Sequence, residues 1–174
     1  MFSDPAKNIA EFDVQDGMKV VDIGAGVGYY AIEAGKKVGP RGIVYAVDVQ
    51  RELLDKLKNG AALVGVRNIE TVWGNAEKIG GTKLREAIAD RTILSNVLFQ
   101  IEVVDRDNLA LELKRITRPG GKLMVIDWQA GTPLGPKTLV PSLIAEGIFT
   151  KAGFVLEESF DAGDHHYGLI FLRP

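Results

Sequence analysis

The glycine-rich loop at residues 24–28 constrains the fold of this chain more than any other feature. It follows a short run rich in valine and isoleucine, residues 18–23, and it contains Gly24, Gly26 and Gly28. An apolar run that stops at glycines predicts a buried strand that leads through a tight turn into a helix. Because glycine has no Cβ atom, the backbone of this turn can approach a ligand closely, and the next helix offers unpaired amide groups to an anion.

Apolar runs and amphipathic segments alternate along the rest of the 174 residues. The expected strands are 18–23, 42–47, 68–73, 92–95, 122–127, 154–160 and 166–172; the expected helices are 30–38, 51–64, one capped by Asp105 or Asp107, and 140–152, with a tight turn at 118–121. Strands separated by helices predict a parallel sheet covered on both faces, whereas the last two strands leave no room for a helix and must form an antiparallel hairpin. We therefore expect one α/β domain over residues 1–174, with a doubly wound, mostly parallel, seven-stranded sheet.

Composition removes several classes of function. The chain has no cysteine, which excludes disulfides, thiolate metal sites and a cysteine nucleophile. Its two histidines, His165 and His166, are adjacent, and no metal site is expected. The apolar runs are too short to cross a bilayer, the first residues lack a secretion-signal pattern, and the net charge of −2 argues against broad nucleic-acid binding. A soluble cytoplasmic protein that binds neither membrane nor nucleic acid is therefore expected.

The residues on either side of the glycine loop indicate which ligand it suits. A dinucleotide-binding loop of the form G-x-G-x-x-G would need glycine at position 29, where this chain has Tyr29. Asp22, just before the first glycine, would repel a pyrophosphate but could hold an ammonium group. An amino-acid moiety therefore fits this loop better than NAD does. The alternative is that the glycines only form a tight turn from strand to helix.

A second carboxylate, Asp48, closes the second expected strand about 20 residues after the loop. A carboxylate at this place can accept hydrogen bonds from both hydroxyls of a ribose, as in nucleotide cofactors generally. The alternative is that Asp48 only caps the helix that follows. Together with Asp22 and the glycines, however, it favours a nucleotide that carries an amino-acid moiety.

The chain resembles the class I S-adenosylmethionine-dependent methyltransferases from residue 18 to its C-terminus. The stretches that carry the resemblance are 21–28, 44–48, 74–77, 94–98 and 113–128. They resemble, in this order, the family's first motif, its ribose-binding strand, its adenine loop, its fourth-strand motif, and its helix, turn and fifth strand. Asn75 stands where the family usually has aspartate, and its amide oxygen can still bond the amino group of adenine.

This resemblance implies a Rossmann-like fold and an enzyme that transfers the sulfonium methyl group of S-adenosyl-L-methionine, leaving S-adenosyl-L-homocysteine. The residues implied to bind the cofactor are Asp22, Gly24, Ala25, Gly26, Gly28, Asp48, Val49, Asn75, Ala76, Ser95 and Asn96. A NAD-binding oxidoreductase and a cofactor-binding partner subunit without catalysis are the competing hypotheses.

The methyl acceptor is expected to be a small molecule. The chain looks closest to the group that includes quinone and arsenite methyltransferases, and the arsenite enzymes rely on cysteines that this chain lacks. Methyltransferases that modify amino groups of DNA and RNA bases usually carry Asn/Asp-Pro-Pro-aromatic after the fourth strand. Here residues 95–98 read Ser-Asn-Val-Leu, which argues against methylation of a base.

Topology places the polar turn at 161–167 beside the carboxyl ends of the parallel strands, where ligands of such sheets bind. His165 or His166 is a candidate general base there, with Asp161 or Asp164 to orient it. The alternative is a hairpin turn whose histidines are merely solvated.

Three further residues are expected on the acceptor side. Asp127 and Trp128 end the fifth strand, and Gln100 lies just beyond the fourth. Trp128 could stack on a planar acceptor or only cover the core, and the role of Asp127 stays open.

Few residues are available to cover the acceptor. Only residues 2–12 and 131–141 could form a lid, which implies an open site or one completed by a partner subunit, and a homo-oligomer is possible. Full activity at the solution mass of a monomer would remove the need for a partner.

Overall fold

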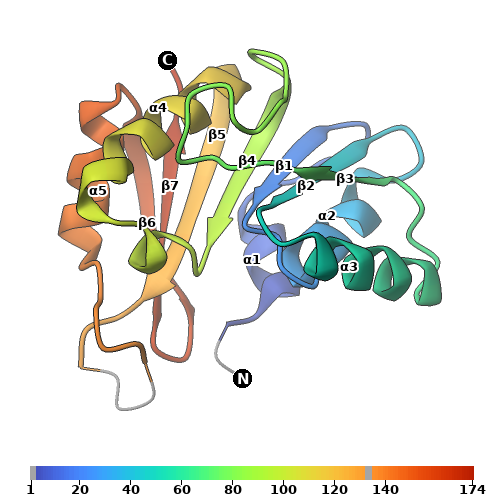
Figure 1. Ribbon diagram of the computed structural model, residues 1–174, viewed down its shortest axis with the longest axis horizontal. Helices are drawn as coiled ribbons and strands as arrows, with labels where there is room; N and C mark the ends of the chain where they lie inside the picture. Colours follow the sequence, from blue (N-terminus) through green and yellow to red (C-terminus); the bar gives the residue numbers. More distant parts are fainter. Residues whose placement is uncertain (1–2, 132–134) are drawn as a thin grey trace.

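The computed structural model describes residues 3–131 and 135–174, which build a seven-stranded sheet with helices on both faces (Figure 1). The strands are β1 (Lys19–Ile23), β2 (Ile43–Asp48), β3 (Ile69–Trp73), β4 (Ala89–Ser95), β5 (Thr117–Trp128), β6 (Val155–Gly163) and β7 (His166–Leu172). The helices are α1 (Pro5–Glu11), α2 (Tyr29–Val38), α3 (Arg51–Leu63), α4 (Arg106–Ile116) and α5 (Ser142–Lys151), with short 3-10 turns at Leu98–Gln100 and Val103–Asp105.

The strand order is β3-β2-β1-β4-β5-β7-β6. Strands β1 to β5 pair in parallel, and β7 runs antiparallel to both of its neighbours, β5 and β6. The expected fold is confirmed. Between β1 and β4 the strand order reverses, and ligands of doubly wound sheets bind beyond the carboxyl ends of the strands at such a point.

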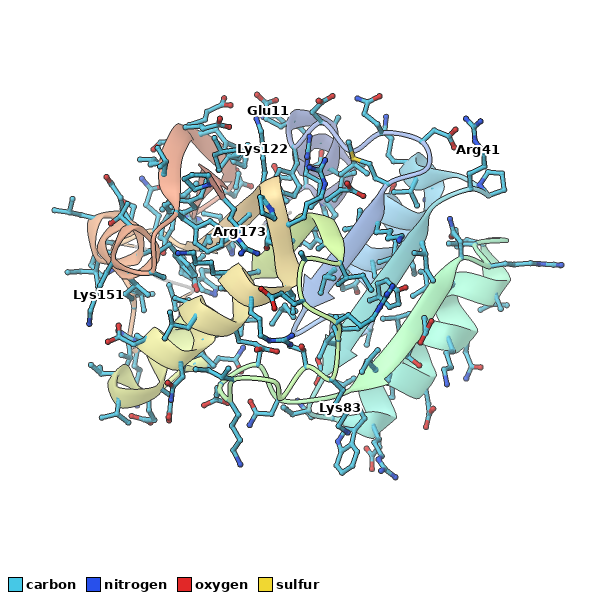
Figure 2. The ribbon with its side chains drawn as sticks, turned by 90° about the horizontal axis from the view of Figure 1, so that it is seen from above. Glu11, Arg41, Lys83, Lys122, Lys151 and Arg173 are labelled. Atoms are coloured by element: carbon cyan, nitrogen blue, oxygen red, sulfur yellow. The ribbon has the colours of Figure 1, made fainter. Side chains whose placement is uncertain are left out.

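Alternation along the central strands divides the core into two layers. Val20 shares a buried cluster on one face of the sheet with Ile9 of α1 and with Phe12 just after that helix. Its neighbour Val21 belongs to the cluster on the other face, which includes Leu113 of α4. Helices α1 to α3 therefore cover one face, and α4 and α5 cover the other (Figure 1). Charged side chains such as Arg41, Lys83 and Lys151 project at the periphery (Figure 2).

The structure differs from the sequence-based expectation at α1 and around the start of β5. Helix α1 was not expected; the Asp4 side chain caps it by accepting a hydrogen bond from the Lys7 amide. The turn expected at 118–121 lies inside β5, where Gly120 has a φ of +73° and the register with β4 shifts. Asp105 occupies the N-cap position of α4 but makes no side-chain capping bond, so its expected capping role is wrong.

The hairpin between β6 and β7 is tighter than expected. Strand β6 continues to Gly163, so the turn consists of Asp164 and His165 rather than the whole stretch 161–167. Positive φ values of +122° at Gly163 and +64° at His165 let two antiparallel strands join this closely. No helix in the part of the chain that the structure describes is long and apolar enough to cross a membrane.

Candidate active site at the carboxyl edge of the sheet

The glycine loop leaves β1 at the point where the strand order reverses. Gly24 and Gly28 have φ values of +67° and +93°, which favour glycine. A Cβ atom on Gly24 would lie 2.3 Å from Val97 Cγ2, and one on Gly28 would lie 2.5 Å from Leu57 Cγ. Both glycines are therefore favoured by the backbone conformation and by the lack of space for a side chain. The backbone of this loop lines two adjoining cavities.

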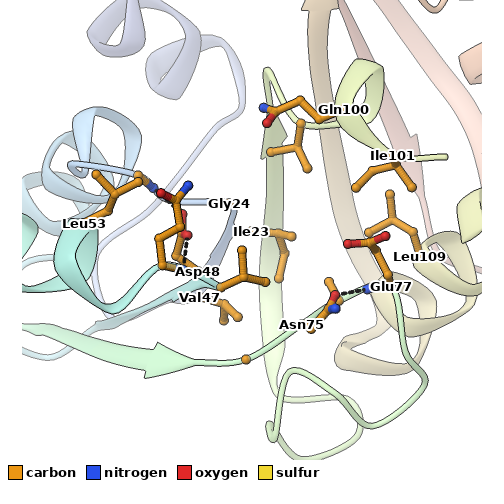
Figure 3. Close-up of a pocket in the computed structure, with 16 residues that line it drawn as sticks. Ile23, Gly24, Val47, Asp48, Leu53, Asn75, Glu77, Gln100, Ile101 and Leu109 are labelled. Carbon is orange, nitrogen blue, oxygen red and sulfur yellow. Dashed lines mark hydrogen bonds between the residues drawn. The ribbon is translucent and has the colours of Figure 1, made fainter.

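The first cavity has a volume of about 310 Å³ and lies between the ends of β1, β2 and β3 (Figure 3). Of the residues implied to bind the cofactor, those that line it are Gly24, Gly26, Asp48, Val49, Asn75 and Ala76. Its opposite wall comes from Ile101 and Leu109, with Leu53 on the Asp48 side. Sequence analysis missed these three apolar residues because they come from elements far apart in the chain.

Asp48 ties the glycine loop to the end of β2. Its Oδ2 accepts a hydrogen bond of 2.9 Å from the amide of Gly26, and its Oδ1 accepts one of 2.8 Å from the amide of Gln50. A carboxylate has about four acceptor positions, so these two bonds leave acceptor capacity for a ligand. Asp48 is buried and lines the first cavity, a placement that suits a pair of ribose hydroxyls.

Asn75 organises the loop on the far side of the first cavity. Its Oδ1 accepts a hydrogen bond of 2.9 Å from the backbone amide of Glu77 (Figure 3). The backbone amide of Asn75 donates to the carbonyl of Gly81 at 2.9 Å. The side-chain oxygen expected to face adenine therefore already closes a local turn. Ala76, beside it, is buried and gives the cavity an apolar surface.

The buried carboxylate of Glu112, on α4, holds this loop from behind. It accepts hydrogen bonds from the amides of Gly80 and Thr82 and forms an ion pair of 2.8 Å with Arg115. Burial alone would raise the pKa of Glu112, but these hydrogen bonds outweigh it and lower the pKa. Helix α4 thus fixes the loop that carries Asn75, a connection that no local motif revealed.

A second cavity of about 650 Å³ adjoins the first, and both are lined by Gly24 and Gly26. Its other lining residues that sequence analysis had singled out are Asp22, Ala25, Ser95, Asn96 and Tyr29. Ser3, Pro5 at the start of α1, Val27 and Tyr30 of α2 also line it. The lid expected from residues 2–12 is therefore present in part, whereas Phe2 itself and part of 131–141 lie outside the described residues.

Two buried polar atoms of residues that line the second cavity have no hydrogen-bond partner among the described residues, Asp22 Oδ2 and Ser95 Oγ. Burial raises the pKa of Asp22 to about 8. A hydrogen bond from the Ala31 backbone amide to the carboxylate partly offsets this rise in pKa, and the negative charge of Asp48 adds to it. A cationic ligand group would give this carboxylate the partner that it lacks. The cavity therefore fits a positively charged amino group next to Asp22.

His166 differs from the expectation of a base that contacts the acceptor. Its side chain is only 1% exposed and lines neither cavity. The ring stacks against Trp128 with centroids 4.4 Å apart, and its Nε2 lies 2.9 Å from Asn96 Oδ1. The structure thus brings His166 to a cavity residue rather than to the cavity itself. His165, at the corner of the hairpin, also lines neither cavity.

The remaining residues expected on the acceptor side, Asp127, Trp128 and Gln100, differ in whether they line a cavity. Asp127 is fully buried and accepts hydrogen bonds from the amides of Phe99 and Trp128. Burial raises its pKa to about 6, partly offset by these bonds and by the charge of His166. Gln100 lines the first cavity and not the second. Asp127 and Trp128 line neither cavity.

Comparison with known proteins decides the family. Residues 14–146 match the sequence profile of a family described as "Methyltransferase domain". The chain belongs to this methyltransferase domain family. The match covers β1 to β5 and therefore contains both carboxylates, the glycine loop and the Asn75 loop.

Several relatives share most of this methyltransferase domain. The "Ubiquinone/menaquinone biosynthesis C-methyltransferase UbiE" of Bordetella avium is 30% identical over 75% of this chain but only 49% of its own length. The "Probable cobalt-precorrin-6B C(15)-methyltransferase (decarboxylating)" of Sulfurisphaera tokodaii is 24% identical, over 81% of this chain and 74% of that protein. The chain thus spans about half the length of the UbiE protein that it matches.

A solved structure agrees over the whole fold. The crystal structure of a SAM dependent methyltransferase from Aquifex aeolicus superposes with a TM-score of 0.87 and 26% identity, covering 99% of this chain and 91% of that one. This likeness confirms the Rossmann-like class I methyltransferase fold.

The described residues fit S-adenosylmethionine, the cofactor of this family. The unpartnered Oδ2 of buried Asp22 suits the ammonium of its methionine part, and the spare acceptor positions of Asp48 suit its ribose. The backbone of Gly24 and Gly26 is shared by the two cavities, so one elongated ligand can reach both carboxylates. NAD, the competing cofactor, is not favoured, because its pyrophosphate would meet a carboxylate.

Proposed function

We propose that this methyltransferase domain transfers the methyl group of S-adenosylmethionine to a small-molecule acceptor bound in the second cavity. One observation carries the proposal: two adjoining cavities meet at the glycine loop, one with the carboxylate of Asp48 and the other with that of Asp22. The curated relatives named above act on small molecules by their descriptions, which supports the substrate class.

The chain's own residues act by binding and alignment. Asp48 accepts hydrogen bonds from the ribose hydroxyls, and Ala76 with Leu109 provides apolar walls for adenine. Asp22 holds the ammonium group and thereby directs the methionine part toward Ser95. The bound cofactor supplies an electrophilic methyl group on a sulfonium. Holding an acceptor atom in line with this methyl group contributes about 7–11 kcal/mol at best, without any catalytic base.

The walls of the second cavity indicate what the acceptor is like. Val27, Tyr29, Tyr30 and Pro5 form an apolar and partly aromatic surround, and Asn96 is a polar lining residue that the methionine part of the cofactor does not use. A flat apolar molecule with one polar edge matches this distribution, because small-molecule sites are mostly apolar with a few placed polar groups. The UbiE relatives are described as methyltransferases of ubiquinone and menaquinone biosynthesis, which is consistent with such an acceptor.

Isothermal titration calorimetry with S-adenosylmethionine and S-adenosylhomocysteine tests the proposal. We expect both to bind one to one, and we expect Asp48→Ala to weaken binding by at least about tenfold, or about 1.4 kcal/mol. Asp55→Ala, an exposed acid on α3, is the matched control and should leave the affinity unchanged. Absence of binding by either compound would refute the assignment of the cofactor.

Methyl transfer itself needs a second experiment. Labelled S-adenosylmethionine incubated with the protein and a cell extract should yield a labelled small molecule. Cofactor binding without any labelled product would instead favour a cofactor-binding subunit that lacks catalysis.

A further inference from the structure

The two ring nitrogens of His166 both face oxygen atoms. Nδ1 lies 2.8 Å from the backbone carbonyl oxygen of Asp164, and Nε2 lies 2.9 Å from Oδ1 of Asn96. A carbonyl oxygen accepts hydrogen bonds and cannot donate them, so each nitrogen must carry a hydrogen to form both bonds. With the Asn96 amide in this orientation, the two bonds together require a positively charged imidazole; with the amide reversed, Nε2 accepts a hydrogen bond and the ring is neutral.

The surroundings of His166 suit a positive charge. The buried carboxylate of Asp127, on β5, interacts electrostatically with the ring. On β6, Asp161 is opposite the neighbouring residue Tyr167, and in the turn Asp164 provides its carbonyl. Just after β4, the residue in contact is Asn96, which is uncharged. Histidine is the side chain that ordinarily changes charge between pH 5 and 8.

Asn96 connects His166 to the second cavity. Two hydrogen bonds hold its backbone. The backbone amide donates to the Ile126 carbonyl at 2.8 Å, and the backbone carbonyl accepts from Gln100 Nε2 at 2.7 Å. Its φ of +56° is a conformation that asparagine tolerates better than most residues. While Oδ1 accepts from His166, no described residue accepts a hydrogen bond from Nδ2, and Asn96 lines the cavity.

We propose that His166 is a positioning residue that sets, through the amide of Asn96, the hydrogen-bonding polarity of the second cavity and thereby selects an acceptor with an anionic oxygen. With a charged His166, Asn96 Oδ1 is held by Nε2–H and the amide N–H groups face the cavity. When His166 loses its Nε2 proton, that nitrogen can only accept, so the amide turns over and presents Oδ1 to the cavity instead. This proposal rests on the assignment of the second cavity as the acceptor site.

The coupling has a direction that can be measured. A carboxylate or phenolate in the cavity accepts from Asn96 Nδ2–H and so stabilises the orientation that requires a charged His166. Anion binding therefore favours proton uptake by His166, and the affinity for the anion falls as pH rises through the titration of this ring. A neutral ligand of the same shape lacks this dependence.

The first test uses the free protein and needs no cofactor. Because the chain has two histidines, ¹⁵N spectra of the imidazoles are simple, and His165→Gln assigns the two sets of signals. We expect both nitrogens of His166 to carry protons at pH 6 and only Nδ1 to carry one at pH 9. Asn96→Asp provides an oxygen that only accepts, and should move the titration of His166 upward by about 1–3 pH units.

Asn96→Gly is the matched variant, since glycine also suits the positive φ and removes the side chain; it should lack the upward shift. Identical titration of His166 in the wild type and in Asn96→Asp would overturn the proposal. A His166 ring that remains neutral throughout pH 5 to 9 would overturn it as well.

The second test measures acceptor selectivity in protein saturated with S-adenosylhomocysteine. Benzoate is ionised over the whole range from pH 6 to 9, and benzamide is its neutral analogue. We expect the Kd of benzoate to rise about tenfold between pH 6 and 9, which corresponds to about 1.4 kcal/mol, while the Kd of benzamide stays within about twofold. His166→Phe keeps the stacking on Trp128 but lacks both donors, and should abolish the pH dependence.

The outcomes separate this proposal from the proposed function. Failure of S-adenosylhomocysteine to bind would refute the cofactor assignment and leave the spectra of the free protein as the test of His166. If the cofactor product binds but benzoate shows the same affinity at both pH values, or no affinity at either, the selection of an anionic acceptor is wrong.

Discussion

At the scale of single residues, Asp22 combines its proposed binding role with a cost in stability. Its carboxylate is buried next to the glycine loop, and burial raises its pKa to about 8. Between pH 4 and 8 the native protein therefore keeps a proton that the unfolded chain has already lost. Because the unfolded state binds fewer protons in this window, the contribution of Asp22 makes the free energy of unfolding fall as pH rises.

Asp22→Asn should remove this dependence. Asparagine does not ionise, so the free energy of unfolding of the variant relative to the wild type should increase between pH 5 and 8, by an amount on the order of a few kcal/mol. Urea denaturation at the two pH values measures it, with the exposed Asp55→Asn as control. The same variant should bind S-adenosylmethionine at least about tenfold more weakly, since the ammonium group loses its charged partner. Equal pH dependence in both proteins would contradict the burial argument.

Gly24 is a residue whose role depends on both space and backbone. Gly24→Ala should lower the free energy of unfolding by about 1–3 kcal/mol, because the new Cβ meets Val97 and the φ of +67° disfavours alanine. Gly147→Ala on α5 is the matched control: its Cβ would meet nothing within 4 Å, and it should stabilise the protein by about 0.5–1 kcal/mol. Thermal unfolding of both variants compares them directly, and equal destabilisation would exclude the steric explanation.

At the scale of elements, α4 acts on the first cavity from a distance. Glu112 fixes the turn at Gly80 and Thr82, and this turn is bonded to Asn75 through Gly81. The loop after β3 thus has a defined shape although it contains no regular structure. Its part of the cavity wall depends on a helix that follows it by about thirty residues.

Glu112→Gln should destabilise the protein by about 1–3 kcal/mol at pH 7, because Arg115 loses its charged partner in a buried network. The pKa of Glu112 is lower in the native protein than the value of 4.5 in the unfolded chain. The contribution of Glu112 to the free energy of unfolding is therefore present above pH 4.5 and is lost as pH falls through the pKa of the native state. The difference between variant and wild type should therefore shrink in acid. Urea denaturation at pH 7 and pH 3 measures this, with the exposed Glu158→Gln as control.

At the scale of the whole molecule, binding of one elongated ligand should stabilise the fold. S-Adenosylhomocysteine at 100 times its Kd should add about 2.7 kcal/mol to the free energy of unfolding, because it binds only the native state. Differential scanning calorimetry over a range of concentrations should show a melting temperature that rises with ligand. Asp48→Ala should show a much smaller rise at the same concentrations, and an equal rise in both proteins would place the ligand elsewhere.

Local sequence determined the layers of this protein and one half of its candidate site. The strand-and-helix alternation, the glycine loop and the positions of Asp22 and Asp48 at strand ends are short-range features, because burial periodicity and backbone freedom act over a few residues. They indicated the fold and the methyl donor. The exact extent of β5 and β6 was not visible, since strand ends depend on the pairing partners that the sheet supplies.

Only the tertiary structure decided which residues surround the second cavity. Asn96 and His166 are separated by 70 positions in the chain and meet because β4, β5 and β7 lie side by side in the sheet. In the folded protein, His166 is buried and lines neither cavity, whereas Gln100 lines the first cavity. The identities of these polar residues were readable from the sequence, but their contacts were not, because the order of the strands sets which side chains meet. The glycine loop thus indicates the donor, and the folded sheet defines the walls of the second cavity.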